Sequence, residues 1–226
     1  MDGETFRMKW YDFVPARLRD VQPTWPTILI AAGAIVLVGL LATAAWLWHS
    51  SQVERGNAAY TVALIRARTA EPAEAPPELR AAAAADLERT LAEFPSHPMA
   101  SQAAYALGNL RFASAQYDKA RAAWQIAVAK GSGGTVATLS AAGIGYAWEA
   151  ERKYAEAAQA FETDLSRLKP TDFYYEELLF DLARVQEHGG KKDAAIATYR
   201  RILKDVPKTV RAEEARGQLA LLGATP

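Results

Sequence analysis

One pattern recurs three times along the chain at a spacing of about 37 residues, and it limits the fold more than any other feature. Each copy carries an alanine and, four positions later, a large aromatic residue: Ala120 and Trp124, Ala157 and Phe161, Ala195 and Tyr199. A repeat of this length is typical of helical hairpins that bury their apolar faces against their neighbours and so stack into a solenoid. The pattern therefore predicts an all-α fold with an extended surface suited to binding.

A second feature is the apolar segment 27–48, which holds no charged residue over 22 positions. As a helix it would be about 33 Å long, enough to cross a bilayer. Trp25, Trp46 and Trp48 lie near its ends, where tryptophan prefers the membrane–water interface. The alternative is a cleaved signal peptide, since Ala42-Thr43-Ala44 resembles a cleavage site. The long, partly acidic leader 1–26 is unlike the short basic start of a signal peptide and favours a retained transmembrane helix.

The basic residues around this segment predict its orientation. Four precede it and one lies in the dozen positions after it: Arg7, Lys9, Arg17 and Arg19, then Arg55. Because basic residues favour the cytoplasmic side, we expect a cytoplasmic leader (1–26), a transmembrane helix (27–48) and a repeat domain (49–226) in the periplasm. The location would then be the bacterial inner membrane. The absence of cysteine is compatible with an oxidising compartment.

The repeat residues resemble the tetratricopeptide repeat, a helix-turn-helix unit. Three repeats open near Ser101, Thr138 and Glu176, and an earlier degenerate repeat supplies only a clear second helix. The matching residues are Leu107-Gly108, Tyr117, Ala120, Trp124 and Ala127; Ile144-Gly145, Trp148, Tyr154, Ala157 and Phe161; Leu182-Ala183, Gly189-Gly190, Ala195, Tyr199, Ile202 and Pro207; and Ala83, Leu87, Thr90 and Pro95. Asp164 departs from the pattern, because the family prefers alanine there.

Packing explains why these residue types recur. Small residues at the Leu-Gly and alanine positions let two helix backbones approach, and Trp124, Phe161 and Tyr199 fill the space toward the next hairpin. We therefore expect these three aromatic residues in the core. The proline-rich stretch 70–77 predicts a loop. The last segment, 211–224, predicts an amphipathic helix that closes the stack through Ala215, Leu219 and Leu222.

The sequence offers little support for catalysis, a metal or a cofactor. His49, His97 and His188 are scattered, and no cysteine is present as nucleophile or ligand. The glycine-rich stretch 131–135 lacks the lysine of a phosphate-binding loop and is expected to be a connection that ends in a helix cap. Charge is balanced, with 26 basic and 26 acidic residues, and gives no reason to expect nucleic acid. We predict that the protein is not an enzyme.

The resemblance implies a protein-binding groove on the first helix of each hairpin. The corresponding residues are Gln102, Tyr105, Asn109, Phe112, Tyr146, Glu149, Glu177, Phe180, Arg184 and His188. An alternative for Tyr105, Phe112 and Tyr146 is packing against the preceding first helix. The carboxylate clamp of chaperone-binding repeats is not expected, because only Asn109 fits and Tyr105 and Ala142 occupy the lysine positions.

Two neighbouring segments differ in charge. Segment 149–187 holds ten acidic and five basic residues, whereas segment 191–216 holds eight basic and four acidic. Solvated helix faces are the favoured interpretation over a docking patch.

The order of leader, single span, four repeats and closing helix resembles the YfgM-like family of ancillary SecYEG translocon subunits. This resemblance implies a membrane-tethered periplasmic module for protein–protein interaction, with the translocon and periplasmic chaperones or their clients as partners. The alternative is a scaffold subunit of another inner-membrane complex. Its contacts would come from the leader and from a small-residue face of the span: Trp10, Tyr11, Phe13, Gly39 and Thr43.

Overall fold

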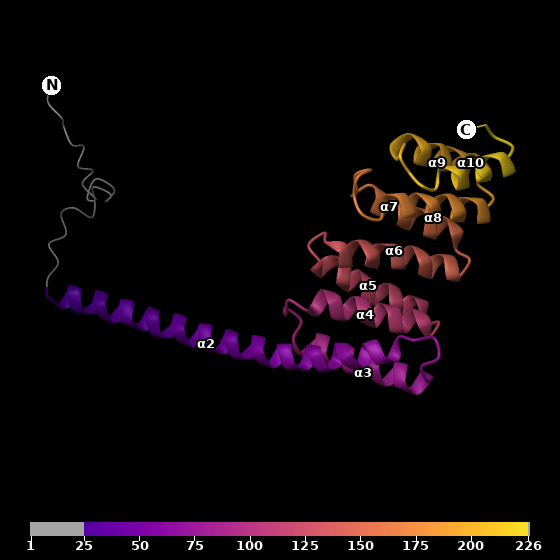
Figure 1. Ribbon diagram of the computed structural model, residues 1–226. Helices are drawn as coiled ribbons and strands as arrows, with labels where there is room; N and C mark the ends of the chain where they lie inside the picture. Colours follow the sequence, from indigo (N-terminus) through magenta and orange to yellow (C-terminus); the bar gives the residue numbers. More distant parts are fainter. Residues whose placement is uncertain (1–24, 226) are drawn as a thin grey trace, which may run out of the picture. The chain divides into compact units, whose positions relative to one another are not determined.

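The computed structural model describes residues 25–225, which form helices and turns without any strand. The chain divides into two compact units, Met1–Ser51 and Gln52–Pro226. Helix α2 (Trp25–Ala70) contributes its first part to the first unit and its last part to the second (Figure 1). Trp10, Tyr11 and Phe13 lie outside the described residues.

The first part of α2 is apolar and exposed. Every side chain from Trp25 to His49 is exposed. Among residues 25–225, α2 is the helix long and apolar enough to cross a membrane, and a signal sequence near the N-terminus has the same properties. Gly39 and Thr43 lie on this part, where the Thr43 hydroxyl donates a hydrogen bond of 2.8 Å to the Gly39 carbonyl.

The second unit, which we call the repeat unit, is a stack of antiparallel hairpins (Figure 1). The last part of α2 pairs with α3 (Pro77–Glu93), and three further hairpins and a final helix follow: α4 (Ala100–Ala113) and α5 (Tyr117–Lys130); α6 (Thr135–Ala150) and α7 (Tyr154–Leu165); α8 (Tyr175–His188) and α9 (Lys192–Asp205); α10 (Ala212–Leu221). The long apolar helix followed by helical repeats confirms the predicted fold class.

The first hairpin consists of the end of α2 and of α3. The Tyr60 hydroxyl donates a hydrogen bond of 2.9 Å to the Phe94 carbonyl, and Ala63 of α2 belongs to the same buried cluster as Leu87 of α3. His97 stacks on Tyr60, with 4.8 Å between ring centroids, and is buried. The end of α2 is therefore the first helix of the degenerate repeat.

The turns inside the three later hairpins share one geometry. Ala115, Arg152 and Gly190 each have a positive φ, of 55°, 59° and 70°. After each, the next backbone N–H bonds a carbonyl five residues back, at 2.8 to 2.9 Å. This is the Schellman ending of a helix, which glycine adopts most easily. Only the third hairpin has glycine at this position, and the other two accept a left-handed residue with a side chain.

Close backbone approach explains the glycines of the repeats. A Cβ on Gly108 would lie 2.4 Å from the Trp124 ring, and one on Gly145 would lie 2.3 Å from Phe161. Trp124, Phe161 and Tyr199 are 4%, 0% and 3% exposed, which confirms their predicted core role.

The ends of two helices test further predictions. Ala215 and Leu219 of α10 are buried and Leu222 is half-buried, as expected for a closing helix. The connection 131–134 joins α5 to α6, as predicted, but the expected cap is wrong. Thr135 is already the first helical residue, and the residue at the cap is Gly134, which makes no side-chain cap hydrogen bond.

Candidate protein-binding groove

The α4 part of the predicted groove is an aromatic patch around Trp124. Tyr105 and Phe112 are partly buried and pack against the cluster of Ala120, Trp124 and Ala147. The rings of Phe112 and Trp124 are 5.7 Å apart, and Asn109 accepts a 3.2 Å hydrogen bond from the Trp124 indole. The Asn109 amide thus holds a core ring in place. Tyr105 and Phe112 thus pack against residues of α5 and α6, which follow α4, whereas the packing alternative named the preceding first helix.

Tyr146 connects α6 to the next hairpin. Its hydroxyl donates to Asp181 and lies 2.9 Å from the Tyr174 hydroxyl, so it accepts from Tyr174. Burial, together with the hydrogen bond to Asp181, holds the pKa of Tyr146 far above its ordinary value, so the phenol stays a neutral donor. Its ring packs edge-on against Phe161 at 5.4 Å. Tyr146 is therefore fixed on both its polar and its apolar side.

Tyr174 precedes α8 and has a left-handed backbone, with φ of 75°. This conformation is unfavourable for a bulky residue by about 1 to 2 kcal/mol. Burial raises the pKa of Tyr174, and the nearby Tyr105 is among the lesser causes. Tyr146 and Tyr174, from separate segments, thus lie close together.

Two arginines tie the C-terminal helices together. Arg184 of α8 pairs with Glu149 of α6 and with Asp181. Arg211, at the start of α10, pairs with Glu177 at 2.6 Å and with Glu214 at 2.7 Å. Its guanidinium also lies 3.6 Å from the centre of the Phe180 ring, a favourable cation–π distance.

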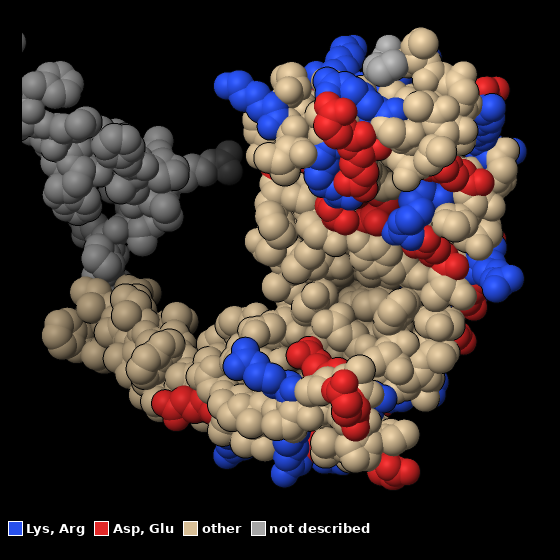
Figure 2. Space-filling model, turned by 45° about the vertical axis from the view of Figure 1, so that its right-hand side comes forward, with Lys and Arg blue, Asp and Glu red and all other residues tan. Residues whose placement is uncertain are grey.

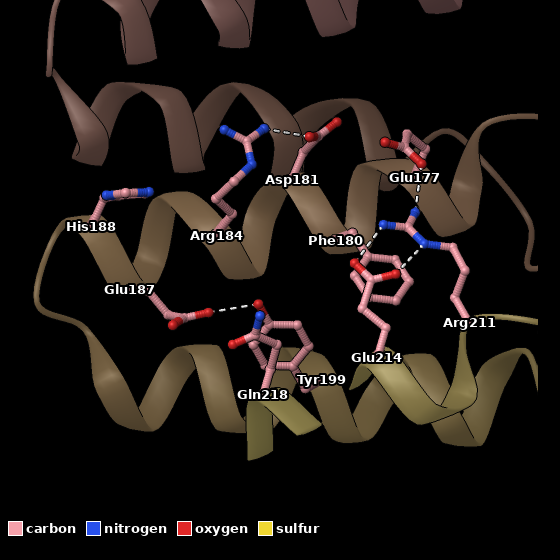
Figure 3. Close-up of a pocket in the computed structure, with 10 residues that line it drawn as sticks. All are labelled: Glu177, Phe180, Asp181, Arg184, Glu187, His188, Tyr199, Arg211, Glu214 and Gln218. Atoms are coloured by element: carbon pink, nitrogen blue, oxygen red, sulfur yellow. Dashed lines mark hydrogen bonds and ion pairs between the residues drawn. The ribbon is translucent and has the colours of Figure 1, made fainter. Parts of the chain in front are cut away.

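These residues enclose a pocket of about 530 Å³ (Figure 3). Side chains from α8, α9 and α10 and the segment before α10 line it: Glu177, Phe180, Asp181, Arg184, Glu187, His188, Tyr199, Arg211, Glu214 and Gln218. The Tyr199 hydroxyl donates to Glu187 at 2.6 Å. Four carboxylates face two guanidiniums, so the lining is acidic on balance.

The structure brings the predicted residues into two neighbouring groups. Glu177, Phe180, Arg184 and His188 line the pocket, and Glu149 joins them through Arg184. Tyr105, Asn109 and Phe112 belong to the aromatic patch, and Tyr146 lies between the groups. Gln102 is exposed at the start of α4. We call the surface of these α4, α6 and α8 residues the groove face.

Sequence reasoning missed six pocket residues: Asp181, Glu187, Tyr199 as a hydroxyl donor, Arg211, Glu214 and Gln218. The contrast between acidic segment 149–187 and basic segment 191–216 was the available signal. Arg211 joins the two segments through Glu177, so part of this charge pairs across the pocket.

The stacked hairpins form a tetratricopeptide-like repeat fold. A family model described as Tetratricopeptide repeat matches residues 177–209, which span α8 and α9. No curated protein matches the chain at a significant level. The comparisons indicate no catalytic family.

Solved structures support the same fold. A single-substitution variant of a Podosopora anserina protein, titled as kinesin light chain with nearly identical TPR-like repeats, has a TM-score of 0.53 at 17% identity and covers 74% of this chain and 84% of its own. The protein without this substitution has a TM-score of 0.51 at 17% sequence identity, and the match covers 75% of this chain and 90% of that protein. RapI in its apo form has a TM-score of 0.60 at 14% sequence identity, and the match covers 76% of this chain and 49% of RapI. At these identities the likeness concerns the fold alone.

Proposed function

We propose that this protein is a membrane-tethered module whose groove face binds a segment of another protein. The observation that carries the proposal is the fixed position of partly exposed aromatic side chains on that face. Tyr146 is held by Asp181, Tyr174 and Phe161, and Phe112 packs on Trp124. Side chains that are already ordered lose little entropy on binding, and aromatic residues dominate binding energy at interfaces.

The groove face has two chemical parts, and these suggest the character of the bound segment. In Figure 2 charged side chains cover the upper part of the repeat unit, over the C-terminal helices, and others lie at its lower end, whereas the middle of the visible face is hollowed and largely uncharged. The aromatic part suits apolar side chains. The pocket beside α8 and α10 suits a polar end with basic groups, because its carboxylates outnumber its guanidiniums.

The cellular setting is part of the proposal. The apolar segment 27–48 would anchor the chain in the bacterial inner membrane, with the leader 1–26 in the cytoplasm and the repeat domain 49–226 in the periplasm. The resemblance to YfgM-like proteins and the basic residues before the span support this arrangement. Partners would then be the translocon and the periplasmic chaperones or exported chains near it.

A pull-down from detergent-solubilised membranes tests the groove. The triple variant Tyr105→Ala, Phe112→Ala and Tyr146→Ala should bind its soluble protein partners about tenfold or more weakly. Each truncated aromatic anchor costs about 1 kcal/mol or more of binding free energy. The matched control replaces exposed residues away from the groove face: Lys119→Ala, Arg152→Ala and Lys204→Ala. Circular dichroism establishes that both variants are folded. If the folded groove variant keeps every partner at parental levels, the groove face is structural only.

A second candidate is a scaffold subunit held by its span. The Thr43 hydroxyl bonds back to the Gly39 carbonyl, and a Cβ on Gly39 would meet nothing within 4 Å. Small residues four positions apart on one helix suit close packing between membrane helices. If segment 27–48 is exchanged for an unrelated apolar helix, a scaffold subunit loses its membrane complex, whereas a groove binder keeps its soluble partners.

A further inference from the structure

Asp164 is an acidic residue in an alanine position of the repeat, and the structure buries it without a partner. It lies near the end of α7, is 4% exposed, and its Oδ2 atom has no hydrogen bond. Burial raises its pKa to about 6, although Arg167 acts in the opposite direction. An unpaired buried carboxylate costs free energy, which a bound cation would reduce.

Asp164 lines a pocket separate from the groove face. The pocket holds about 460 Å³, within the usual range for ligand sites. Residues of α5, α6 and α7 line it together with Arg167, among them Val128, Ile144, Trp148, Glu156 and Ala160. On α6, Ile144 and Trp148 are each two positions from Tyr146, which places them about 200° around the helix. This pocket therefore lies on the opposite side of α6 from the groove face.

The charges around the pocket leave the Asp164 carboxylate without an ion-pair partner, although Arg167 lies nearby. At the Trp148 end, Arg121 lies 3.6 Å from the ring centre and pairs with Glu151, and Lys153 lies 4.9 Å from the ring centre. At the Asp164 end, Arg167 also lines the pocket and lowers the pKa of Asp164, but it is exposed and forms no ion pair with this carboxylate among the described residues. The C-terminal end of a helix, where Asp164 lies, also favours positive charge.

Apolar side chains lead from the opening toward Asp164. Val128 of α5, Ile144 of α6 and Ala160 of α7 all line the pocket. A lysine side chain combines a four-carbon apolar stem with a compact ammonium group. Its stem could lie along these residues while the ammonium pairs with the carboxylate.

We propose that the Asp164 pocket is a second docking site, which binds a lysine side chain flanked by apolar residues in a segment of a partner protein. The charge complementarity at Asp164 selects the cation, and the apolar lining selects the stem and its flanking residues. The site is independent of the groove face, and a partner could occupy both sides of the stack.

Two fluorescent peptides of about 12 residues, rich in alanine, serve as probes. One carries a lysine between two leucines. The other has norleucine in place of the lysine, which keeps the apolar stem and removes the charge. Fluorescence anisotropy measures their binding to the full chain in nanodiscs of zwitterionic lipid, with empty nanodiscs subtracted. At pH 7.5 the lysine peptide should bind about tenfold more tightly, as expected for one charge-assisted hydrogen bond.

Asp164→Asn should abolish this preference, because it keeps the shape and removes the charge. Glu156→Gln, at an exposed acid in the same pocket, should retain it. The groove variant with three alanines should also retain it, so failure here is distinct from failure of the groove proposal. Equal binding of the two peptides by the parent, or an unchanged preference in Asp164→Asn, would overturn the assignment. Binding of free n-hexylammonium without binding of the lysine peptide would make the pocket a small-amine site and would reject protein docking.

Discussion

At the scale of single residues, Asp164 has the clearest consequence for stability. Its pKa in the folded protein is about 6, above the ordinary value near 4. Between these two pH values the folded state binds more protons than the unfolded state, so stability falls as pH rises from about 4 to 6. Above pH 6 the destabilisation is complete and constant.

Replacing the carboxylate should remove this destabilisation. We expect Asp164→Asn to raise the free energy of unfolding by roughly 2 kcal/mol at pH 8 and to give little gain at pH 4. Urea unfolding at the two pH values measures the difference. Glu162→Gln, at an exposed acid of the same helix, should change stability little at either pH. A gain of equal size at pH 4 and pH 8 would contradict a charge-dependent origin.

The sequence predicted core residues well and polar roles poorly. The spacing of Ala120 and Trp124 carried enough information, because a large ring needs a small neighbour across the helix pair, and Gly108 provides it. Asp164 stood out only as a departure from the pattern. Whether an acid is buried depends on the neighbouring helices, and a single repeat does not contain them. The hydrogen bond from Tyr199 to Glu187 could not be predicted either, because it joins two different helices.

At the scale of secondary-structure elements, the attachment of α10 depends on Arg211. This side chain bridges Glu177 of α8 and Glu214 of α10 and stacks on Phe180. Arg216 forms only an exposed pair with Glu213 within α10. The two arginines therefore form a matched pair of positions for testing what holds the closing helix.

We expect Arg211→Gln to lower the free energy of unfolding by about 1 to 2 kcal/mol and to speed amide exchange in α10. Arg216→Gln should have almost no effect, as is usual for exposed ion pairs. The hydrogen bond from Arg211 lowers the pKa of Glu214. The stabilisation from this pair is therefore present above about pH 4.5 and is lost as pH falls below that value, so the difference between parent and Arg211→Gln should shrink in acid. Equal exchange rates in α10 for both variants would contradict the bridging role.

Helices were predictable from periodicity, but their turns were less so. Gly190 is a usual signal for a left-handed helix ending, whereas Ala115 and Arg152 adopt the same conformation without such a signal. All three turns carry the same backbone hydrogen bond, so this turn geometry does not require glycine. At the start of α6, Gly134 stands in place of the side-chain cap that the sequence predicted.

At the scale of the whole molecule, charges far apart in the sequence meet at one pocket. Arg184 reaches Glu149, and Arg211 reaches Glu177, each more than 30 positions away. The repeat period places successive first helices side by side, so such pairs follow from the fold. The sequence showed two oppositely charged segments but could not indicate which charges pair and which remain to meet a partner.

The membrane orientation is the last prediction, and the absence of cysteine makes it directly measurable. We expect Ala197→Cys, at an exposed position of α9, to react with a membrane-impermeant maleimide on intact spheroplasts. Thr5→Cys in the leader should react only after lysis, because the basic residues before the span favour the cytoplasm. The reversed pattern would place the repeats in the cytoplasm. Loss of the Thr5→Cys label from a shortened protein would identify a cleaved signal peptide. In either case the groove face would remain, but its partners would no longer be sought beside the periplasmic side of the translocon.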